Sequence, residues 1–125
     1  MAEFLTTTGC SFYIEKIIID AKESLTLVTP YLSLSKNLID RLTDAENRGV
    51  KIILIYGKNS LKHQEQQKLD RIENIAIYFC ENLHAKCYFN EQLMVITSMN
   101  LYEFSEKNNR EMGVLVRRES DQSMF

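Results

Sequence analysis

Helix-period and strand-like segments alternate along the first two-thirds of the chain, and this alternation restricts the possible folds. Residues 11–23 carry apolar side chains at the spacing of an amphipathic helix. A second helix is expected after Ser35, a good N-cap, and it should end at Gly49. Polar residues 60–73 are predicted to form a third, surface helix. Strand-length apolar runs separate these segments, at residues 25–29, 50–56 and 75–80.

The last third of the chain reads as strands without long helices between them. Residues 83–89 and 93–98 are spaced as a β-hairpin, and residues 112–116 form a last strand. Residues 101–107 are expected to form a short helix, and neither chain end shows an element. The sequence therefore predicts an α/β fold, in which a mixed, mostly parallel β-sheet of about six strands is flanked by helices on both faces.

Composition favours one globular domain over residues 1–125. Apolar residues make up 45% and charged residues 26% of the 125 residues. No apolar run is long enough to cross a bilayer, and the first residues do not resemble a signal peptide. We therefore expect a cytoplasmic protein without stable membrane insertion.

The three cysteines, Cys10, Cys80 and Cys87, fit this expectation. An odd number without a signal peptide is typical of reduced thiols. Cys80 and Cys87 lie in apolar stretches and are expected to be buried. A zinc site with His84 is disfavoured, because alternation along a strand places Cys87 on the opposite face.

A cluster of polar residues is predicted at one end of the hairpin. His84 and Lys86 are two residues apart, so on a strand they share a face, roughly 6.5 Å apart. The second hairpin strand returns to this end and brings Ser98 and Asn100 beside them. The group suits a phosphodiester, because Lys and Asn can hold non-bridging oxygens while an imidazole attacks phosphorus or moves a proton. No carboxylate pair suggests a metal site.

These residues resemble the signature of the phospholipase D superfamily. The signature is H-x-K, then S-x-N, then a Glu before the final strand. It is matched by His84 and Lys86, by Ser98 and Asn100, and by Glu111. Together with the element order, the resemblance covers most of the chain. The residues around the motif are similar to those of small bacterial phospholipase D-like proteins. A terminal helix that relatives often carry after the last strand is not evident.

The resemblance implies a role for each matching residue. His84 would be the nucleophile that forms a phosphohistidine, and Lys86 and Asn100 would bind the phosphate. Ser98 would be a supporting hydroxyl, and Glu111 would orient His84. The family chemistry uses two copies of the motif without a metal or other cofactor, and this chain has one, so a homodimer is implied.

Two positions depart from the family pattern. The usual Asp is replaced by Glu91 when counted forward from Lys86, or by Asn90 when counted back from Ser98, so the loop is one residue short. Thr97 stands where the family usually has Gly. Lys58, after the strand at residues 50–56, is a candidate phosphate ligand or an exposed loop lysine. Tyr102 and Phe104 could stack on a base, although such residues are more often core or dimer contacts.

Two functions remain open from the sequence. The first is a metal-independent phosphodiesterase that acts on nucleic acid more readily than on lipid, since no apolar membrane-binding stretch is present. The second is a weakly active or inactive module that binds nucleic acid or a protein partner. The departures in the loop and an isoelectric point of about 5.7 favour the second.

Overall fold

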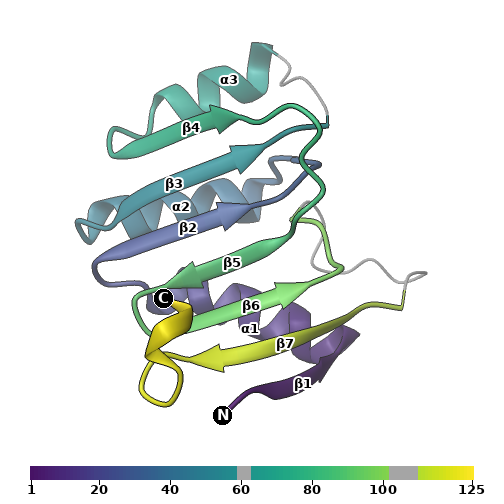
Figure 1. Cartoon of the computed structure of the whole chain (residues 1–125). Coiled ribbons are helices and arrows are strands. Elements are labelled where there is room, and N and C mark those ends of the chain that lie inside the picture. The colour runs from purple at the N-terminus through teal and green to yellow at the C-terminus, as the bar shows by residue number, and fades with distance from the viewer. Residues whose placement is uncertain (59–62, 102–109) are drawn as a thin grey trace.

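The framework of the molecule is a twisted β-sheet (Figure 1). A computed structural model describes residues 1–58, 63–101 and 110–125, and these contain seven strands in the order β1-β7-β6-β5-β2-β3-β4. The strands are β1 (Glu3–Thr6), β2 (Ser24–Val28), β3 (Lys51–Tyr56), β4 (Ile75–Phe79), β5 (Cys87–Asn90), β6 (Leu93–Thr97) and β7 (Met112–Arg117). The helices of the described residues are α1 (Thr7–Asp20), α2 (Lys36–Asn47), α3 (His63–Asp70) and the short 3-10 helix η1 (Gln122–Met124).

The sheet is mixed, as predicted, but the prediction that it is mostly parallel is wrong. Only β2–β3 and β3–β4 pair in parallel among the described strands, whereas β1–β7, β7–β6, β6–β5 and β5–β2 are antiparallel. The hairpin inserts beside β2, and β7 and β1 extend the sheet from it. Strands β5 and β6 are joined by a two-residue turn, a connection that only antiparallel neighbours allow.

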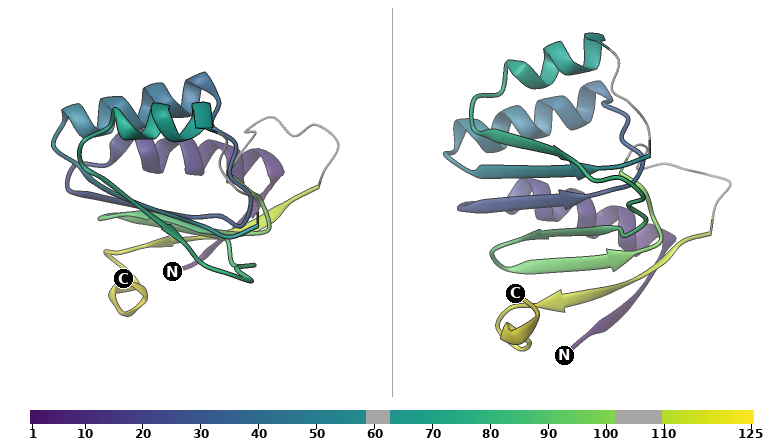
Figure 2. Two further views of the ribbon diagram at one scale, coloured as in Figure 1. Left: turned by 90° about the horizontal axis from the view of Figure 1, so that it is seen from above. Right: turned by 45° about the horizontal axis from the view of Figure 1, so that its top comes forward.

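Helices on both faces were also predicted, and this is wrong for the described residues. Figure 2 shows α1, α2 and α3 on the same face of the sheet. The same strand direction is shared by β1, β2, β3 and β4. The three crossovers that join them all advance across the sheet toward β4, its last strand. Right-handed crossovers that advance in the same direction place their helices on the same face.

Local sequence signals account for α2. The Ser35 side chain accepts a hydrogen bond from the Leu38 backbone N–H at 3.1 Å, which caps the first turn. Leu38, Leu42 and Ala45 are buried on one stripe. Gly49 follows the last turn with φ +84°, a conformation that strains residues with a side chain, so the predicted end of the helix is confirmed.

The N-terminal element was missed because its pattern is too weak to read. Strand β1 has four residues, of which Leu5 alone is buried. It leads directly into α1, which begins at Thr7 rather than at residue 11.

The prediction that Cys80 is buried is wrong, because this residue follows the end of the edge strand β4 and is exposed, whereas Cys10 is buried.

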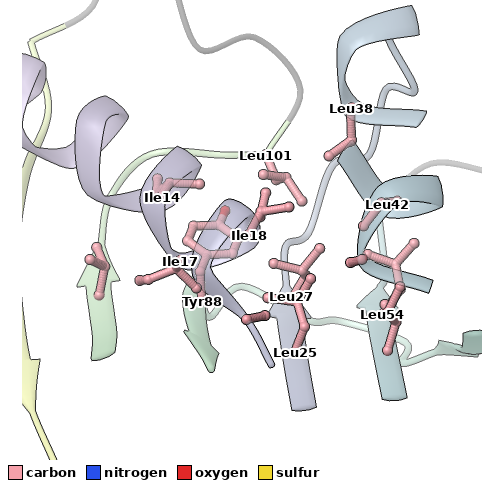
Figure 3. Packing of buried hydrophobic residues seen from close by; sticks show 14 of the residues in the cluster. Ile14, Ile17, Ile18, Leu25, Leu27, Leu38, Leu42, Leu54, Tyr88 and Leu101 are labelled. Carbon is pink, nitrogen blue, oxygen red and sulfur yellow. The ribbon is translucent and has the colours of Figure 1, made fainter. Parts of the chain in front are cut away.

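The core lies between the helices and the sheet face that they cover. Figure 3 shows Ile17 and Ile18 of α1 beside Tyr88 of β5, with Leu25 and Leu27 of β2 next to them. All of these side chains are fully buried, and each contributes about 1.5–3 kcal/mol to folding.

No helix within the described residues is long and apolar enough to cross a membrane.

Candidate active site

The residues that the sequence singled out lie together at one edge of the sheet, where edge means the side formed by the ends of the strands and not an outermost strand. Strands β2, β3, β4 and β6 end at this edge, and β5 and β7 begin there (Figure 1). His84 and Lys86 immediately precede β5, Ser98 and Asn100 follow β6, and Glu111 precedes β7. Three chain segments therefore bring the candidate residues to the same edge.

His84 and Lys86 lie ahead of the strand on which they were expected. Strand β5 begins at Cys87, because residues 80–86 first have to cross from the end of β4. The Lys86 ammonium donates a hydrogen bond to the His84 carbonyl at 3.2 Å. The Lys86 carbonyl accepts one from the Thr97 N–H at 3.3 Å, which attaches this segment to β6. The His84 side chain is exposed and available to a ligand.

Gly57 allows the segment before His84 to pass close to the end of β3. A Cβ at Gly57 would lie 2.1 Å from the Cys80 carbonyl oxygen and 2.6 Å from the Leu83 Cβ. Both distances are far below van der Waals contact, so a side chain at this position would push the crossing segment away. The glycine thus contributes to the position of His84.

Ser98 and Glu111 form a pair beside the histidine segment. The Ser98 hydroxyl donates a short hydrogen bond to a carboxylate oxygen of Glu111 and accepts one from the Met112 N–H at 3.2 Å. The Thr7 hydroxyl accepts a hydrogen bond from the Glu111 N–H at 2.7 Å and donates one to the Glu111 carbonyl at 3.2 Å. The backbone of Glu111 is therefore attached to the start of α1. No hydrogen bond within the described residues joins Glu111 to His84.

The backbone on both sides of Asn100 is held by hydroxyl groups of two residues that the sequence did not single out. The Tyr88 hydroxyl donates to the Met99 carbonyl at 2.7 Å, and the Leu101 N–H donates to the Thr29 hydroxyl at 2.9 Å. Tyr88 and Thr29 are both fully buried. Burial raises the pKa of Tyr88 above its usual value, so the phenol stays a donor. A polar group buried on a strand needs such a partner, which is the signal that could have identified both residues.

The Asn100 side chain itself is incompletely satisfied. Its Oδ1 atom is buried and has no hydrogen-bond partner within the described residues. Buried polar atoms in proteins are nearly always paired, so an unpaired one at a cluster of polar residues is a candidate ligand contact. The amide oxygen could accept a hydrogen bond from a ligand, or Nδ2 could donate one after a side-chain flip.

Lys58 lies at the same edge. It follows the end of β3 and Gly57, and its backbone N–H donates to the Pro30 carbonyl at 2.7 Å. The side chain is exposed. The structure thus places Lys58 beside the strand ends that carry the other candidate residues, in the position from which it could reach an anion.

The two residues at the family's Asp position lie at the far end of the hairpin. The Asn90 Oδ1 accepts from the N–H groups of Gln92 and Leu93 at 2.7 and 2.9 Å, and its Nδ2 donates to the Ile17 carbonyl at 2.9 Å. The Glu91 carboxylate accepts from the backbone N–H groups of Lys22 and Glu23. Burial opposes ionisation of Glu91, but these N–H donors outweigh it and hold its pKa below the usual value.

Two expectations from the sequence fall outside the described residues. The predicted helix at residues 101–107 and the aromatic residues Tyr102 and Phe104 fall in the segment 102–109.

Within the described residues, no group of three or more His, Cys, Asp or Glu side chains could hold a metal ion.

Comparison with known proteins relates this arrangement to one family. Residues 14–124 match the family model "Cardiolipin synthase, PLD-like domain". No curated protein sequence matches the chain.

Solved structures share the fold at low sequence identity. Nuc from Salmonella typhimurium, a phospholipase D family member, is 17% identical with a TM-score of 0.73, and the match covers 99% of this chain and 90% of Nuc. NucT from Helicobacter pylori is 15% identical with a TM-score of 0.77, over 99% of this chain and 89% of NucT. TrmBL2, an archaeal chromatin protein, is 15% identical with a TM-score of 0.70, over 99% of this chain and 48% of TrmBL2. The chain is a member of the phospholipase D superfamily and carries its PLD-like domain.

Proposed function

We propose that the chain is a metal-independent phosphodiesterase of the nuclease type that works through a phosphohistidine intermediate at a homodimer interface. One observation carries the proposal: His84, Lys86, Ser98, Asn100 and Glu111 converge at one sheet edge from three separate segments. The exposed His84 imidazole, the Lys86 ammonium and the Asn100 amide, whose Nδ2 would donate to a phosphate oxygen after a side-chain flip, form a site that suits a phosphate diester.

The proposed reaction has two displacements at phosphorus. An imidazole nitrogen of His84 attacks phosphorus, a P–N bond forms, and the bond to the leaving oxygen breaks. The leaving oxygen takes a proton from His84 of the partner subunit. Water then attacks the phosphohistidine and gives its proton back to that imidazole, and the P–N bond breaks. Lys86 and Asn100 hold the non-bridging oxygens and stabilise the charge that develops on them.

The supporting residues act on position rather than on phosphorus in this proposal. Ser98 fixes the Glu111 carboxylate, and Thr7 fixes the Glu111 backbone. Once the dimer and substrate are in place, Glu111 would accept from the second nitrogen of His84 and hold its orientation. Lys58 would bind a further phosphate oxygen of the substrate.

A dimer follows from the number of histidines at the site. One chain supplies a single His84, and the proposed reaction needs an attacking imidazole and a protonated one. A twofold axis beside the edge would place two copies of His84 and Lys86 together, because such an interface is isologous. It would also form a positive pocket despite the net charge of −2.

Nucleic acid is the substrate that the relatives support best. The structural neighbours include Nuc and NucT, and TrmBL2 is described as showing a novel mode of DNA binding. This fold-level likeness supports the substrate class by analogy.

Turnover of bis-p-nitrophenyl phosphate tests the proposal. We expect the purified chain to release nitrophenol, to keep this activity in EDTA, and to lose it in His84→Ala. Absence of turnover, or activity that disappears in EDTA and returns with Mg²⁺, would contradict the proposed mechanism.

A second function is favoured by one contact. The Glu111 carboxylate pairs with Ser98 and, within the described residues, not with His84. A domain without an oriented histidine could bind nucleic acid or a protein partner without cleaving it. Stoichiometric binding of an oligonucleotide by a chain that leaves both the oligonucleotide and bis-p-nitrophenyl phosphate intact would favour this alternative.

A further inference from the structure

A pair of aromatic rings lies at the same sheet edge as the candidate active site and has no role in the proposed chemistry. Tyr56 ends β3, Phe79 ends β4, and the two residues are directly paired across the strands. Their ring centroids are 5.3 Å apart, and the planes meet edge to face at 72°. Tyr56 packs against the core, whereas Phe79 is 59% exposed. The pair is therefore a supported aromatic surface that is open to solvent.

The aromatic pair opens on the same side of the sheet as the candidate residues. Tyr56 continues the face of Leu54, which is buried against the helices. The segment that carries Asn100 lies on this side too, because the hydroxyl of Tyr88, which is buried against the helices, donates to the Met99 carbonyl. This segment and the Tyr56–Phe79 pair therefore share the helix-covered side at the edge where the strands end.

The chain connects the aromatic pair directly to His84. The Cys80 N–H donates to the Tyr56 carbonyl at 2.8 Å, and the Leu83 N–H donates to the Cys80 carbonyl at 3.2 Å. Leu83 lies against Gly57, the residue after Tyr56. Strands β3 and β5 are separated by β2 alone, so Tyr56 lies roughly 10 Å from the start of β5, and Phe79, one strand further on β4, lies roughly 14 Å from it.

The chemistry of this edge matches a nucleotide with a free base. Lys58, two residues after Tyr56, and Lys86, just before β5, add positive charge at this edge, which suits the phosphates of one strand. An exposed ring supported from below offers a face or edge on which a base can stack. In a duplex the bases are stacked inside and cannot reach such a ring, and a lipid headgroup offers no base.

We propose that Tyr56 and Phe79 form a base-stacking subsite, so that the chain takes single-stranded nucleic acid with an unpaired base near the phosphodiester in the site. This inference rests on the proposed function and narrows its substrate class. Phe79 makes the contact with the base, and Tyr56 holds the Phe79 ring in place.

Binding of two short probes isolates the contribution of the base. We would measure fluorescence anisotropy with a labelled thymidine hexanucleotide and with an abasic strand of equal length, in a His84→Ala background that prevents cleavage. Phe79→Ala should weaken binding of the thymidine strand about 10-fold, because the stack between the base and the ring is lost. The same substitution should leave the affinity for the abasic strand unchanged, and Phe79→Tyr should restore binding of the thymidine strand.

Tyr78→Ala is the matched control. Tyr78 is 55% exposed on the neighbouring position of the same strand, but alternation places it on the opposite face of the sheet. We expect Tyr78→Ala to bind both probes as the parent does. Equal losses for Tyr78→Ala and Phe79→Ala, or an equal loss on the abasic strand, would overturn the subsite.

Two further outcomes distinguish base stacking from membrane binding and from the proposed catalysis. Phosphatidylglycerol vesicles that bind through Phe79 more tightly than the thymidine strand would overturn the subsite in favour of a membrane surface. A chain that fails to hydrolyse bis-p-nitrophenyl phosphate, yet shows the base-dependent effect of Phe79→Ala, would support the subsite and reject the proposed catalysis.

Discussion

The two ends of the β5–β6 hairpin use polar residues in opposite ways. At the turn, Asn90 is 1% exposed, and its side chain makes three hydrogen bonds to backbone groups. The Glu91 carboxylate beside it accepts from two backbone N–H groups. At the open end, the His84 imidazole is exposed and the Asn100 Oδ1 is buried without a partner among the described residues.

The difference separates structural polar residues from candidate functional ones. A side chain whose donors and acceptors are all occupied by backbone contributes to folding and has no capacity left for a ligand. Asn100 is different, because Tyr88 and Thr29 hold the backbone on both sides of it and its own Oδ1 atom stays without a partner among the described residues. The comparison predicts that substitutions at the turn affect stability and that substitutions at the open end affect activity.

The largest expected effect is the loss of activity in His84→Ala. Removal of the proposed nucleophile should lower kcat for bis-p-nitrophenyl phosphate by at least about 10³-fold. Because the side chain is exposed, the free energy of unfolding should change by less than about 0.5 kcal/mol. Kinetics and urea denaturation of the same sample would measure both. Wild-type turnover by the variant would remove His84 from the mechanism.

The next effect is the loss of stability in Asn90→Ala. The substitution leaves the N–H groups of Gln92 and Leu93 and the Ile17 carbonyl without this partner. We expect the free energy of unfolding to fall by about 3 kcal/mol, which urea denaturation would measure. Gln92→Ala, at an exposed position two residues further along the turn, is the control and should change the free energy of unfolding little. A stable Asn90→Ala chain with reduced kcat would reverse the comparison.

The sequence predicted the elements better than it predicted how they assemble. Ser35 and Gly49 mark the ends of α2 because capping is a local property of the backbone. The antiparallel majority could not be read locally, because it depends on where the hairpin inserts beside β2. The described helices share one face because the crossovers from β1 to β4 all advance in one direction, which is also a property of the whole sheet. Strand order is set by the packing of the whole sheet, which a local pattern does not encode.

The candidate site shows the same division. The spacing of His84 and Lys86 in the sequence predicts that they lie together, and the hairpin register brings Ser98 and Asn100 to the same edge. Tyr88 and Thr29 were missed because each reads as an ordinary strand residue. Their hydroxyl bonds to residues 99 and 101 exist only once the segment after β6 has folded over them.

Glu111→Gln should have a smaller effect than His84→Ala. The amide oxygen of Gln can still accept from the Ser98 hydroxyl, so the local structure is kept while the negative charge is lost. We expect kcat to fall by about 10- to 100-fold with little change in KM, because the positioning of the imidazole is impaired and substrate binding is not. A Glu111→Gln chain as inactive as His84→Ala would give Glu111 a direct part in the chemistry.

The smallest effect is a pH-dependent loss of stability in Glu91→Gln. The pKa of Glu91 is lower in the folded chain than in the unfolded one, so its ionised form stabilises the fold. This stabilisation is fully present above the unfolded pKa of about 4.3 and disappears as the pH falls through the folded value. Because the carboxylate is partly solvated, we expect Glu91→Gln to lower the free energy of unfolding at pH 7 by at most about 1 kcal/mol. Urea denaturation at pH 7 and pH 3 should show the difference from the parent chain narrowing at the lower pH, with turnover unchanged at pH 7. A difference that stays constant with pH would mean that the charge of Glu91 does not stabilise the turn.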